Sequence, residues 1–371
     1  MSKPLISIIF PTFNRNDEVE FNLNFFKENI SVPYEVFILD NSPEPSDFSL
    51  NHNEYYIFLN ENIGTSSRNI GITKANSPIC LLLDDDSHPF PGTVEKIIEE
   101  FKKLPKKCAG LISEIHNPDG GREASLLPTV FHGAGVAFKT DILINNGISY
   151  PENFCFYGEE YRMTLELYSH GFHLKKSDSF KVMHRRSQQG RDLSKIFYYL
   201  GRNNKAIWED LVPGKFLSSV QYDSQRRYEL TSIKENVSDA FQKGIEESLS
   251  SSTAHKMSVD QFEQFSMLSM LSELPFEDSY ALCGTGKFPT LWAEQISMKC
   301  KKLIIADFNS GLIDHTFGDF KVVNPESAVK ENAVFINGLS SDIDFEKWHQ
   351  LLTQNNREEL VIRHGYKPNF C

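Results

Sequence analysis

The sequence predicts an α/β fold built on a largely parallel sheet, and three observations support this prediction. Short apolar runs of the length of buried strands occur at residues 5–10, 34–39, 55–59 and 79–83. Helical stretches begin near residues 16 and 65, and alternation of strands with helices is typical of parallel sheets. Each run stops at a cluster of polar residues. Because ligands bind at the carboxyl ends of strands in open α/β sheets, we expect a site along that edge.

The strongest signal is the run at 79–83, which stops at three consecutive carboxylates, Asp84, Asp85 and Asp86. Adjacent acids repel one another, and they tolerate this most easily around a cation. Mg²⁺ and Mn²⁺ prefer oxygen ligands, and Mg²⁺ commonly binds one or two carboxylates together with substrate phosphates. An acidic turn in solvent is the alternative, and residues 342–344 repeat the Asp-x-Asp spacing after a Ser-Ser turn without such surroundings. Position at a strand end therefore carries the metal prediction.

Five short segments follow one another in a characteristic order. They are Ser-Ile-Ile-Phe-Pro-Thr-Phe-Asn at 7–14, Phe-Ile-Leu-Asp-Asn-Ser at 37–42, Asn-Ile-Gly at 62–64 with Arg68, Asn69 and Gly71, the acids at 84–86, and Phe-Tyr-Gly-Glu-Glu at 156–160. In order and spacing, over roughly residues 5–190, the chain resembles the inverting GT-A glycosyltransferases of glycosyltransferase family 2. The resemblance implies a GT-A fold, a nucleotide-diphosphosugar donor, a divalent cation and inversion at the anomeric carbon.

The resemblance also implies which residues contact the donor. A nucleotide base needs an apolar wall and a hydrogen-bonding acid, which Pro11, Phe13 and Asp40 can provide. By the resemblance, Asp40 meets a uracil or thymine ring, with Thr12 and Asn14 nearby. An ordinary strand-ending turn is the alternative for Pro11 and Asn14. The other implied donor contacts are Asn41, Gly64, Arg68, Asn69, Asp84 and Asp85. Of these, Arg68 lies near a predicted helix N-terminus, which suits anions, although a plain surface arginine is the alternative.

The same resemblance implies the metal ligands and the catalytic base. Asp84, Asp86 and His184 form the metal set, although a lone histidine is more often not a ligand. Inversion by direct displacement needs a carboxylate that takes the acceptor proton, and Glu160 matches that position, with Glu159 orienting it. The family usually carries Glu-Asp here, so the choice between the two stays open. We expect the helix start to lower the pKa of both carboxyl groups.

The rest of the chain predicts two further parts. After a catalytic domain over residues 1–190, residues 191–275 read as a helical segment without strand signals. Residues 276–371 read as a small Rossmann-like domain, because a Gly-Thr-Gly turn at 284–286 is followed about 20 residues later by Asp307 at a strand end. Pro289 replaces the third glycine of that pattern. A packing or regulatory role is therefore as plausible as a nucleotide site.

Composition limits the partners and the location. The net charge of −12, from 38 basic and 50 acidic residues, argues against nucleic acid as the main partner. The N-terminus shows no signal segment, and no apolar stretch approaches the ~20 residues that span a bilayer. The 6 cysteines form no Cys-x-x-Cys pair, which is typical of reduced cysteines in a cytosolic protein. We expect a cytoplasmic protein, with peripheral contact at the inner membrane face as an alternative.

Together with these features, the resemblance implies a metal-dependent hexosyltransferase-like enzyme of polysaccharide biosynthesis. It would move a sugar from a UDP- or dTDP-sugar to a hydroxyl of a glycan or lipid-linked saccharide, with Mg²⁺ or Mn²⁺ as cofactor. A nucleotidyltransferase is one alternative, but the chain lacks a Gly-rich, basic phosphate loop after the first strand. A non-catalytic nucleotide-sugar-binding module is the other, and the intact acidic residues count against it.

Overall fold

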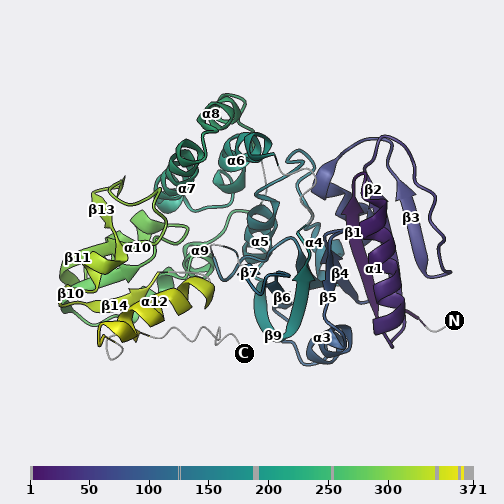
Figure 1. The fold of residues 1–371 in the computed structure, drawn as a ribbon, viewed down its shortest axis with the longest axis horizontal. Coiled ribbons are helices and arrows are strands. Elements are labelled where there is room, and N and C mark those ends of the chain that lie inside the picture. The colour runs from purple at the N-terminus through teal and green to yellow at the C-terminus, as the bar shows by residue number, and fades with distance from the viewer. Residues whose placement is uncertain are drawn as a thin grey trace. The chain divides into compact units, whose positions relative to one another are not determined.

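The computed structural model describes residues 3–123, 125, 127–186, 192–251, 255–338, 342–357 and 361–362, the last pair and 342–345 for the backbone alone. The chain forms two compact units. The first consists mainly of Met1–Ala124 and Thr129–Arg191, and the second mainly of Asp192–Asn369. Figure 1 shows both, with the helices and strands labelled where there is room.

The first unit is built on a mixed sheet with the strand order β3-β2-β1-β4-β8-β6-β9-β5, in which β7 pairs with β6. The strands are β1 (Ile6–Thr12), β2 (Tyr34–Asp40), β3 (Glu54–Phe58), β4 (Ile79–Leu83), β5 (Ser87–Pro89), β6 (Cys108–His116), β7 (Arg122–Glu123), β8 (Gly135–Lys139) and β9 (His173–His184). The first four strands of the chain are parallel, as the sequence predicts. Beyond β4 the sheet is mixed, because β8 runs antiparallel to β4 and β6 and β5 runs antiparallel to β9, whereas β6 and β9 are parallel.

Helices cover both faces of this sheet. They are α1 (Asn16–Asn29), α2 (Arg68–Lys74), α3 (Thr93–Phe101), α4 (Thr140–Asn146) and α5 (Glu159–Ser169), and a 3₁₀ turn, η1 (Gly64–Ser67), leads into α2. Successive side chains of a strand point to opposite faces, so Ile8 belongs to one apolar core and Ile9 to the other. Burial on both faces explains why the central strand β4 is apolar throughout.

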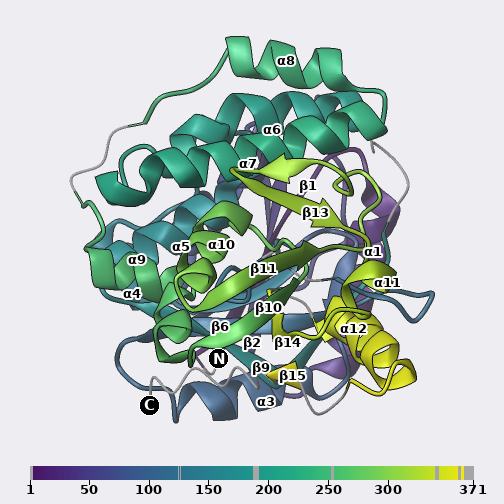
Figure 2. The ribbon, with the colours of Figure 1, turned by 90° about the vertical axis from the view of Figure 1, so that its left-hand side faces the viewer.

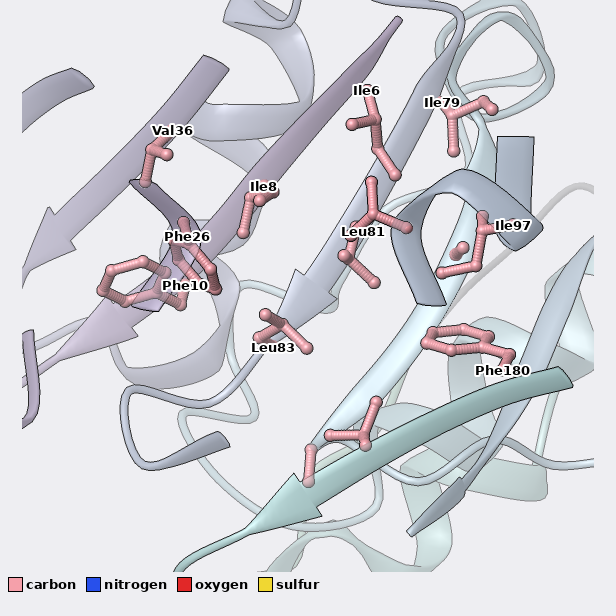
Figure 3. Packing of buried hydrophobic residues seen from close by; sticks show 14 of the residues in the cluster. Ile6, Ile8, Phe10, Phe26, Val36, Ile79, Leu81, Leu83, Ile97 and Phe180 are labelled. Atoms are coloured by element: carbon pink, nitrogen blue, oxygen red, sulfur yellow. The ribbon is translucent and has the colours of Figure 1, made fainter. Parts of the chain in front are cut away.

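Figure 3 shows one of these cores, in which Ile8 and Phe10 of β1 lie near Phe26 of α1, and Leu81 of β4 lies near Ile97 of α3. The core fixes β1 and β4 as neighbours. Consequently the residues that follow these two strands emerge at the same edge of the sheet.

The second unit combines helices with a smaller sheet. Its helices are α6 (Leu193–Trp208), α7 (Gly214–Lys234), α8 (Ser238–Glu246), α9 (Val259–Phe265), η2 (Leu268–Glu273), α10 (Pro289–Ser297), α11 (Pro325–Ala328) and α12 (Asp342–Gln354). Its strands are β10 (Glu277–Cys283), β11 (Cys300–Ala306), β12 (Thr316–Phe317), β13 (Phe320–Val323), β14 (Val334–Asn337) and β15 (Val361–Ile362), in the order β12-β13-β11-β10-β14-β15. Figure 2 shows β13, β11, β10 and β14 next to one another. None of the helices in the described ranges has the length and apolar character that crossing a membrane requires.

Candidate active site

The three consecutive aspartates occupy the turn between β4 and β5. Ser87 closes this turn, because its hydroxyl accepts from the Asp84 N–H (2.9 Å) and donates to the Ala134 carbonyl (2.7 Å). Strand β5 then pairs antiparallel with β9, and this pairing sets Ser87 opposite His184. The end of β9 is thereby brought to the acidic turn, although about 100 residues separate them in sequence.

Asp84, Asp86 and His184 come together as a possible cation site. Each offers one ligand atom, and these atoms all lie within 4.8 Å of one another. His184 Nε2 lies 3.2 Å from Asp86 Oδ1, and on the far side of the ring Nδ1 lies 3.0 Å from Glu123 Oε1. Two carboxylates and an imidazole suit Mg²⁺ or Mn²⁺, and a carboxylate behind a metal-ligating histidine is a usual second partner. The residues present therefore fit a divalent cation.

Electrostatics around this set favour a positive charge. Burial alone lowers the pKa of His184, but hydrogen bonding to Asp86 and Glu123 outweighs burial and raises this pKa to about 10. The proton thus compensates the nearby carboxylates. A divalent cation would replace it, because metal binding requires the neutral imidazole.

Asp85 faces a different way from its two neighbours. Its carboxylate accepts from the Thr12 hydroxyl (2.8 Å) and from Arg15 (2.9 Å), and Arg15 also reaches Asp86 at 3.4 Å. Burial raises the pKa of Asp85 to about 6, against the opposing effect of Arg15. Asp85 and Thr12 therefore join the ends of β4 and β1, and the predicted donor contacts of both residues stay predictions.

The ends of β1 and β2 also meet. The Asn14 N–H donates to the Ser42 hydroxyl at 2.8 Å, and Phe13 is 45% exposed beside them. Asp40, by contrast, is buried, and its carboxylate accepts from the Ser42 N–H (2.9 Å) and the Tyr56 hydroxyl (2.7 Å). Both Asp40 oxygens are therefore engaged within the unit.

Two further predicted donor residues, Asn41 and Asn69, have partners of their own, while Pro11 is half-buried at the end of β1. Asn41 Oδ1 accepts from the Ile63 N–H (3.1 Å), which fixes the segment before Gly64. Asn69 exchanges two hydrogen bonds of 2.9 Å with the backbone of Tyr150. The structure thus gives Asn41 and Asn69 positioning contacts, and their contact with a donor stays a prediction.

Gly64 and Arg68 connect η1 and α2 to the acidic turn. Gly64 has a φ of 65°, and a Cβ at this position would lie 2.0 Å from the Cys155 carbonyl oxygen. Arg68 is not a surface arginine, since its side chain is only 1% exposed, and it donates to Asp84 Oδ1 at 2.5 Å. The arginine therefore orients one of the predicted metal ligands.

Glu159 and Glu160 begin α5, directly after Gly158, as the sequence predicts. Glu159 is buried, whereas Glu160 is partly exposed, and Glu160 Oε1 lies 3.0 Å from where a Gly133 Cβ would stand. The expectation of a lowered pKa is wrong for both. Burial raises the pKa of Glu160 and raises that of Glu159 further, and it outweighs the backbone hydrogen bonds at the helix start.

Sequence reasoning did not assign roles to two residues that contact the site. Arg15 belongs to the segment after β1 but received no role, although a cation beside three acids could have been expected. Glu123 gave no signal, because it lies on a two-residue strand after a turn. Its carboxylate contacts the ring of His184 and also that of His132, whose Nε2 lies 3.2 Å from Glu123 Oε2. Three groups, His132, His184 and Arg186, hold the pKa of Glu123 well below its usual range despite burial.

In the second unit, the glycine turn of the dinucleotide pattern is closed by its own acid. The Asp307 carboxylate accepts from the Thr285 N–H (2.8 Å) and from the Thr285 hydroxyl (2.7 Å). Arg227 donates to the same hydroxyl and to the Gly286 carbonyl. These contacts give the pattern a structural role within the unit.

Several solved structures resemble the chain at low identity. Residues 1–349 of S. aureus TarS in complex with UDP-GlcNAc give a TM-score of 0.42 at 14% identity, covering 65% of this chain and 90% of that one. Another S. aureus TarS structure gives 0.40 at 16% identity and covers 62% of this chain, which spans only 43% of that protein. The mannosyltransferase PcManGT from Pyrobaculum calidifontis, in complex with GDP-Man and Mn²⁺, gives 0.43 at 13% identity, covering 80% and 85%. No curated protein sequence matches the chain.

The family comparison is more direct. Residues 7–156 match the family model described as glycosyl transferase family 2. This stretch includes β1 to β4, the acidic turn, Arg68 and Glu123, and it ends just before the paired glutamates. The first unit therefore contains a glycosyl transferase family 2 domain with the GT-A fold.

Proposed function

We propose that the protein is a glycosyltransferase that transfers a sugar with inversion from a UDP- or dTDP-sugar to a hydroxyl acceptor, and that a divalent cation is required. The main support is that Asp84 and Asp86, which follow β4, lie close to His184 at the end of β9. The ligand atoms of the three residues lie within 4.8 Å of one another. Such a set suits the cation that accompanies a diphosphate. The domain match supports sugar transfer as the reaction.

Donor binding would use the edge formed by the ends of β1, β2 and β4. Asp84, Asp86 and His184 would hold Mg²⁺ or Mn²⁺, and the cation would neutralise charge on the diphosphate leaving group. Arg68 fixes Asp84 through its 2.5 Å hydrogen bond, while Arg15 offsets the charge of Asp85 and Asp86. The exposed ring of Phe13 is available as an apolar wall for the base.

Glu160 would act as the general base that accepts the proton of the acceptor hydroxyl. In a single displacement, the acceptor oxygen bonds to the anomeric carbon as the bond to the diphosphate breaks, and the base receives the hydroxyl proton. Glu160 is partly exposed and faces Gly133, where no side chain stands in the way. Glu159 is buried, and its strongly raised pKa keeps it protonated to higher pH, which suits an orienting role.

The experiment that tests this proposal measures nucleotide binding and transfer with and without Mn²⁺. UDP and dTDP should raise the melting temperature in the presence of Mn²⁺, by mass action on the folded state. Asp86→Asn should abolish this metal dependence and the turnover. Asp278→Asn, which changes an exposed acid of the second unit, should affect neither. Full transfer activity in excess EDTA would contradict the proposal.

Two finer parts of the proposal rest on the family resemblance. They are a glycan or lipid-linked saccharide as acceptor, and a place in cytoplasmic polysaccharide biosynthesis, with membrane contact as an alternative. A third part is the division after residue 190 into a helical segment, 191–275, and a Rossmann-like domain, 276–371. Acceptor screening with the full chain addresses the first, since folds do not fix substrates.

A further inference from the structure

The histidine of the cation site has a carboxylate directly behind it. His184 closes β9, and its side chain is 9% exposed. Its Nε2 faces Asp86, while its Nδ1 lies 3.0 Å from Glu123 Oε1. Glu123 thus contacts the histidine on the side away from the acidic turn, and it does not belong to the group of possible ligands Asp84, Asp86 and His184.

A neutral imidazole carries one N–H and one lone pair, and only the lone pair binds a metal. If Nδ1 keeps its proton for Glu123, then the Nε2 lone pair faces Asp86 and the cation. Without an acceptor at Nδ1, the ring can turn or adopt the other tautomer. The outer carboxylate therefore decides both the tautomer and the orientation of the ligand.

Glu123 is itself held in place. Arg186 Nε donates to Oε1 at 2.5 Å. His132 Nδ1 accepts from the Ala134 N–H at 3.2 Å, so the proton of a neutral His132 lies on Nε2, which is 3.2 Å from Glu123 Oε2. Both carboxylate oxygens are engaged, and strand β7 fixes the backbone through pairing with Ile115 of β6.

We propose that Glu123 is a positioning residue for the metal site, which presents the Nε2 lone pair of His184 to the divalent cation. This inference rests on the proposed function, since it requires His184 to be a ligand. The residue contacts neither donor nor acceptor in this role. Its effect is on cation affinity, and through affinity on turnover at limiting metal.

The chain offers a matched control on the neighbouring strand. Glu114 of β6 forms a similar pair, with His116 Nε2 2.6 Å from Glu114 Oε1, and neither residue is among the possible cation ligands. Glu114→Gln therefore removes a glutamate–histidine pair from the same sheet without touching the site. It separates the loss of a partly buried glutamate–histidine pair from the loss of histidine positioning.

The test measures Mn²⁺ affinity of the full chain by calorimetry, and independently by electron paramagnetic resonance of free Mn²⁺. Glu123→Ala should weaken Mn²⁺ binding about 10- to 100-fold. Glu123→Gln, which keeps one acceptor oxygen of the same reach, should fall between this variant and the unchanged protein. Glu114→Gln should bind Mn²⁺ as the unchanged protein does. Should Glu123→Ala fail to fold, Glu123→Gln carries the comparison.

A second readout reports the tautomer directly. In the Mg²⁺-loaded protein with ¹⁵N-labelled histidine, long-range ¹H–¹⁵N spectra should show His184 protonated at Nδ1. In Glu123→Gln this signal should shift or split. A purely structural Glu123 would lower the melting temperature but leave both Mn²⁺ affinity and the tautomer unchanged, which would overturn the inference.

His184→Ala separates this inference from the proposed function. If His184→Ala weakens Mn²⁺ binding and the folded Glu123 variants do not, the metal site stands and the role of Glu123 is wrong. If His184→Ala leaves Mn²⁺ affinity unchanged, His184 is not a ligand, and the proposed metal site and the inference fail together.

Discussion

The buried guanidinium of Arg68 donates to Asp84 Oδ1 at 2.5 Å and to the Leu83 carbonyl at 2.9 Å. The arginine is 1% exposed and the aspartate 34% exposed. A buried charge is tolerated only when it is paired, so each residue depends on the other for its place. The pair thereby ties α2 to the acidic turn, across the edge at which we propose that the donor binds.

Arg68→Met should therefore lower the free energy of unfolding by about 3 kcal/mol, the low end for a broken buried pair, because Asp84 keeps access to water. Urea unfolding followed by circular dichroism measures this change. Arg226→Met is the control, because Arg226 and Glu229 form a partly exposed pair 2.8 Å apart, worth at most about 1 kcal/mol. Equal losses in the two variants would show that burial of Arg68 contributes nothing.

Gly64 allows the segment before α2 to approach the segment before α5. Its φ of 65° is in the left-handed region, and a Cβ would lie 2.0 Å from the Cys155 carbonyl oxygen. Gly64→Ala should lower the free energy of unfolding by about 1 kcal/mol, because alanine disfavours the left-handed region. In addition, the new Cβ should displace Cys155 and the glutamates after it. We expect lower stability and a lower rate of transfer.

Gly147→Ala provides a matched comparison for that variant. Gly147 also has a φ of 65°, but nothing lies within 4 Å of the position of its Cβ. It should therefore show the backbone penalty alone, with the rate of transfer unchanged. If Gly64→Ala is no less stable and no less active than Gly147→Ala, the close approach has no consequence.

The sequence predicts the parallel part of the sheet well, and the reason is local. Strand β4 is apolar at every position because both of its faces are buried, and the polar residues after it mark its end. The antiparallel placement of β8 could not be predicted, because its pairing with β4 and β6 depends on contacts between distant segments.

The candidate site divides in the same way. Asp84 and Asp86 could be predicted because they directly follow a buried strand. His184 could be predicted as a ligand only through the family resemblance. Glu123 has neither periodicity nor a motif, and only the pairing of β7 with β6 brings it to His184. The pKa values of Glu159 and Glu160 depend on burial, which a helix-start argument does not include.

In the second unit, Lys287 is buried and should give the stability a distinct pH dependence. Its Nζ donates to the Tyr228 hydroxyl at 2.8 Å and lies over the rings of Tyr228 and Trp208. Burial, with a contribution from Arg227, lowers the pKa of Lys287 well below its usual range. Between that lowered pKa and about 10.4, the unfolded chain binds more protons than the folded chain, so stability rises with pH.

Lys287→Met should remove this rise, which amounts to at most about 1.4 kcal/mol per pH unit, and should stabilise the protein near pH 7 by about 1 kcal/mol or more. The 3 tryptophans, Trp208, Trp292 and Trp348, all belong to the second unit, so their fluorescence follows its unfolding by urea. Lys301→Met, at an exposed ion pair with Asp278, should keep the slope. A slope that persists in Lys287→Met would assign it to other groups.

The paired glutamates at the start of α5 should differ in their effect on transfer. A base acts only in its ionised form, so kcat/KM should rise with pH through the pKa of that carboxyl group. Since burial raises the pKa of Glu160, this acid limb should lie above the range of an ordinary glutamate, about 4.3. Glu160→Gln should cut transfer by on the order of a hundredfold or more, with UDP and Mn²⁺ affinities retained.

Glu159→Gln should have a smaller effect and keep the acid limb, because the amide resembles the protonated form that burial favours at this position. Glu166→Gln, which removes the charge of the ion pair with Arg162 further along the same helix, controls for damage to α5 and should transfer normally. If Glu159→Gln loses transfer and Glu160→Gln does not, the two roles are reversed. If both variants transfer at the unchanged rate, neither glutamate is the base, and the acceptor proton goes to a group outside this pair.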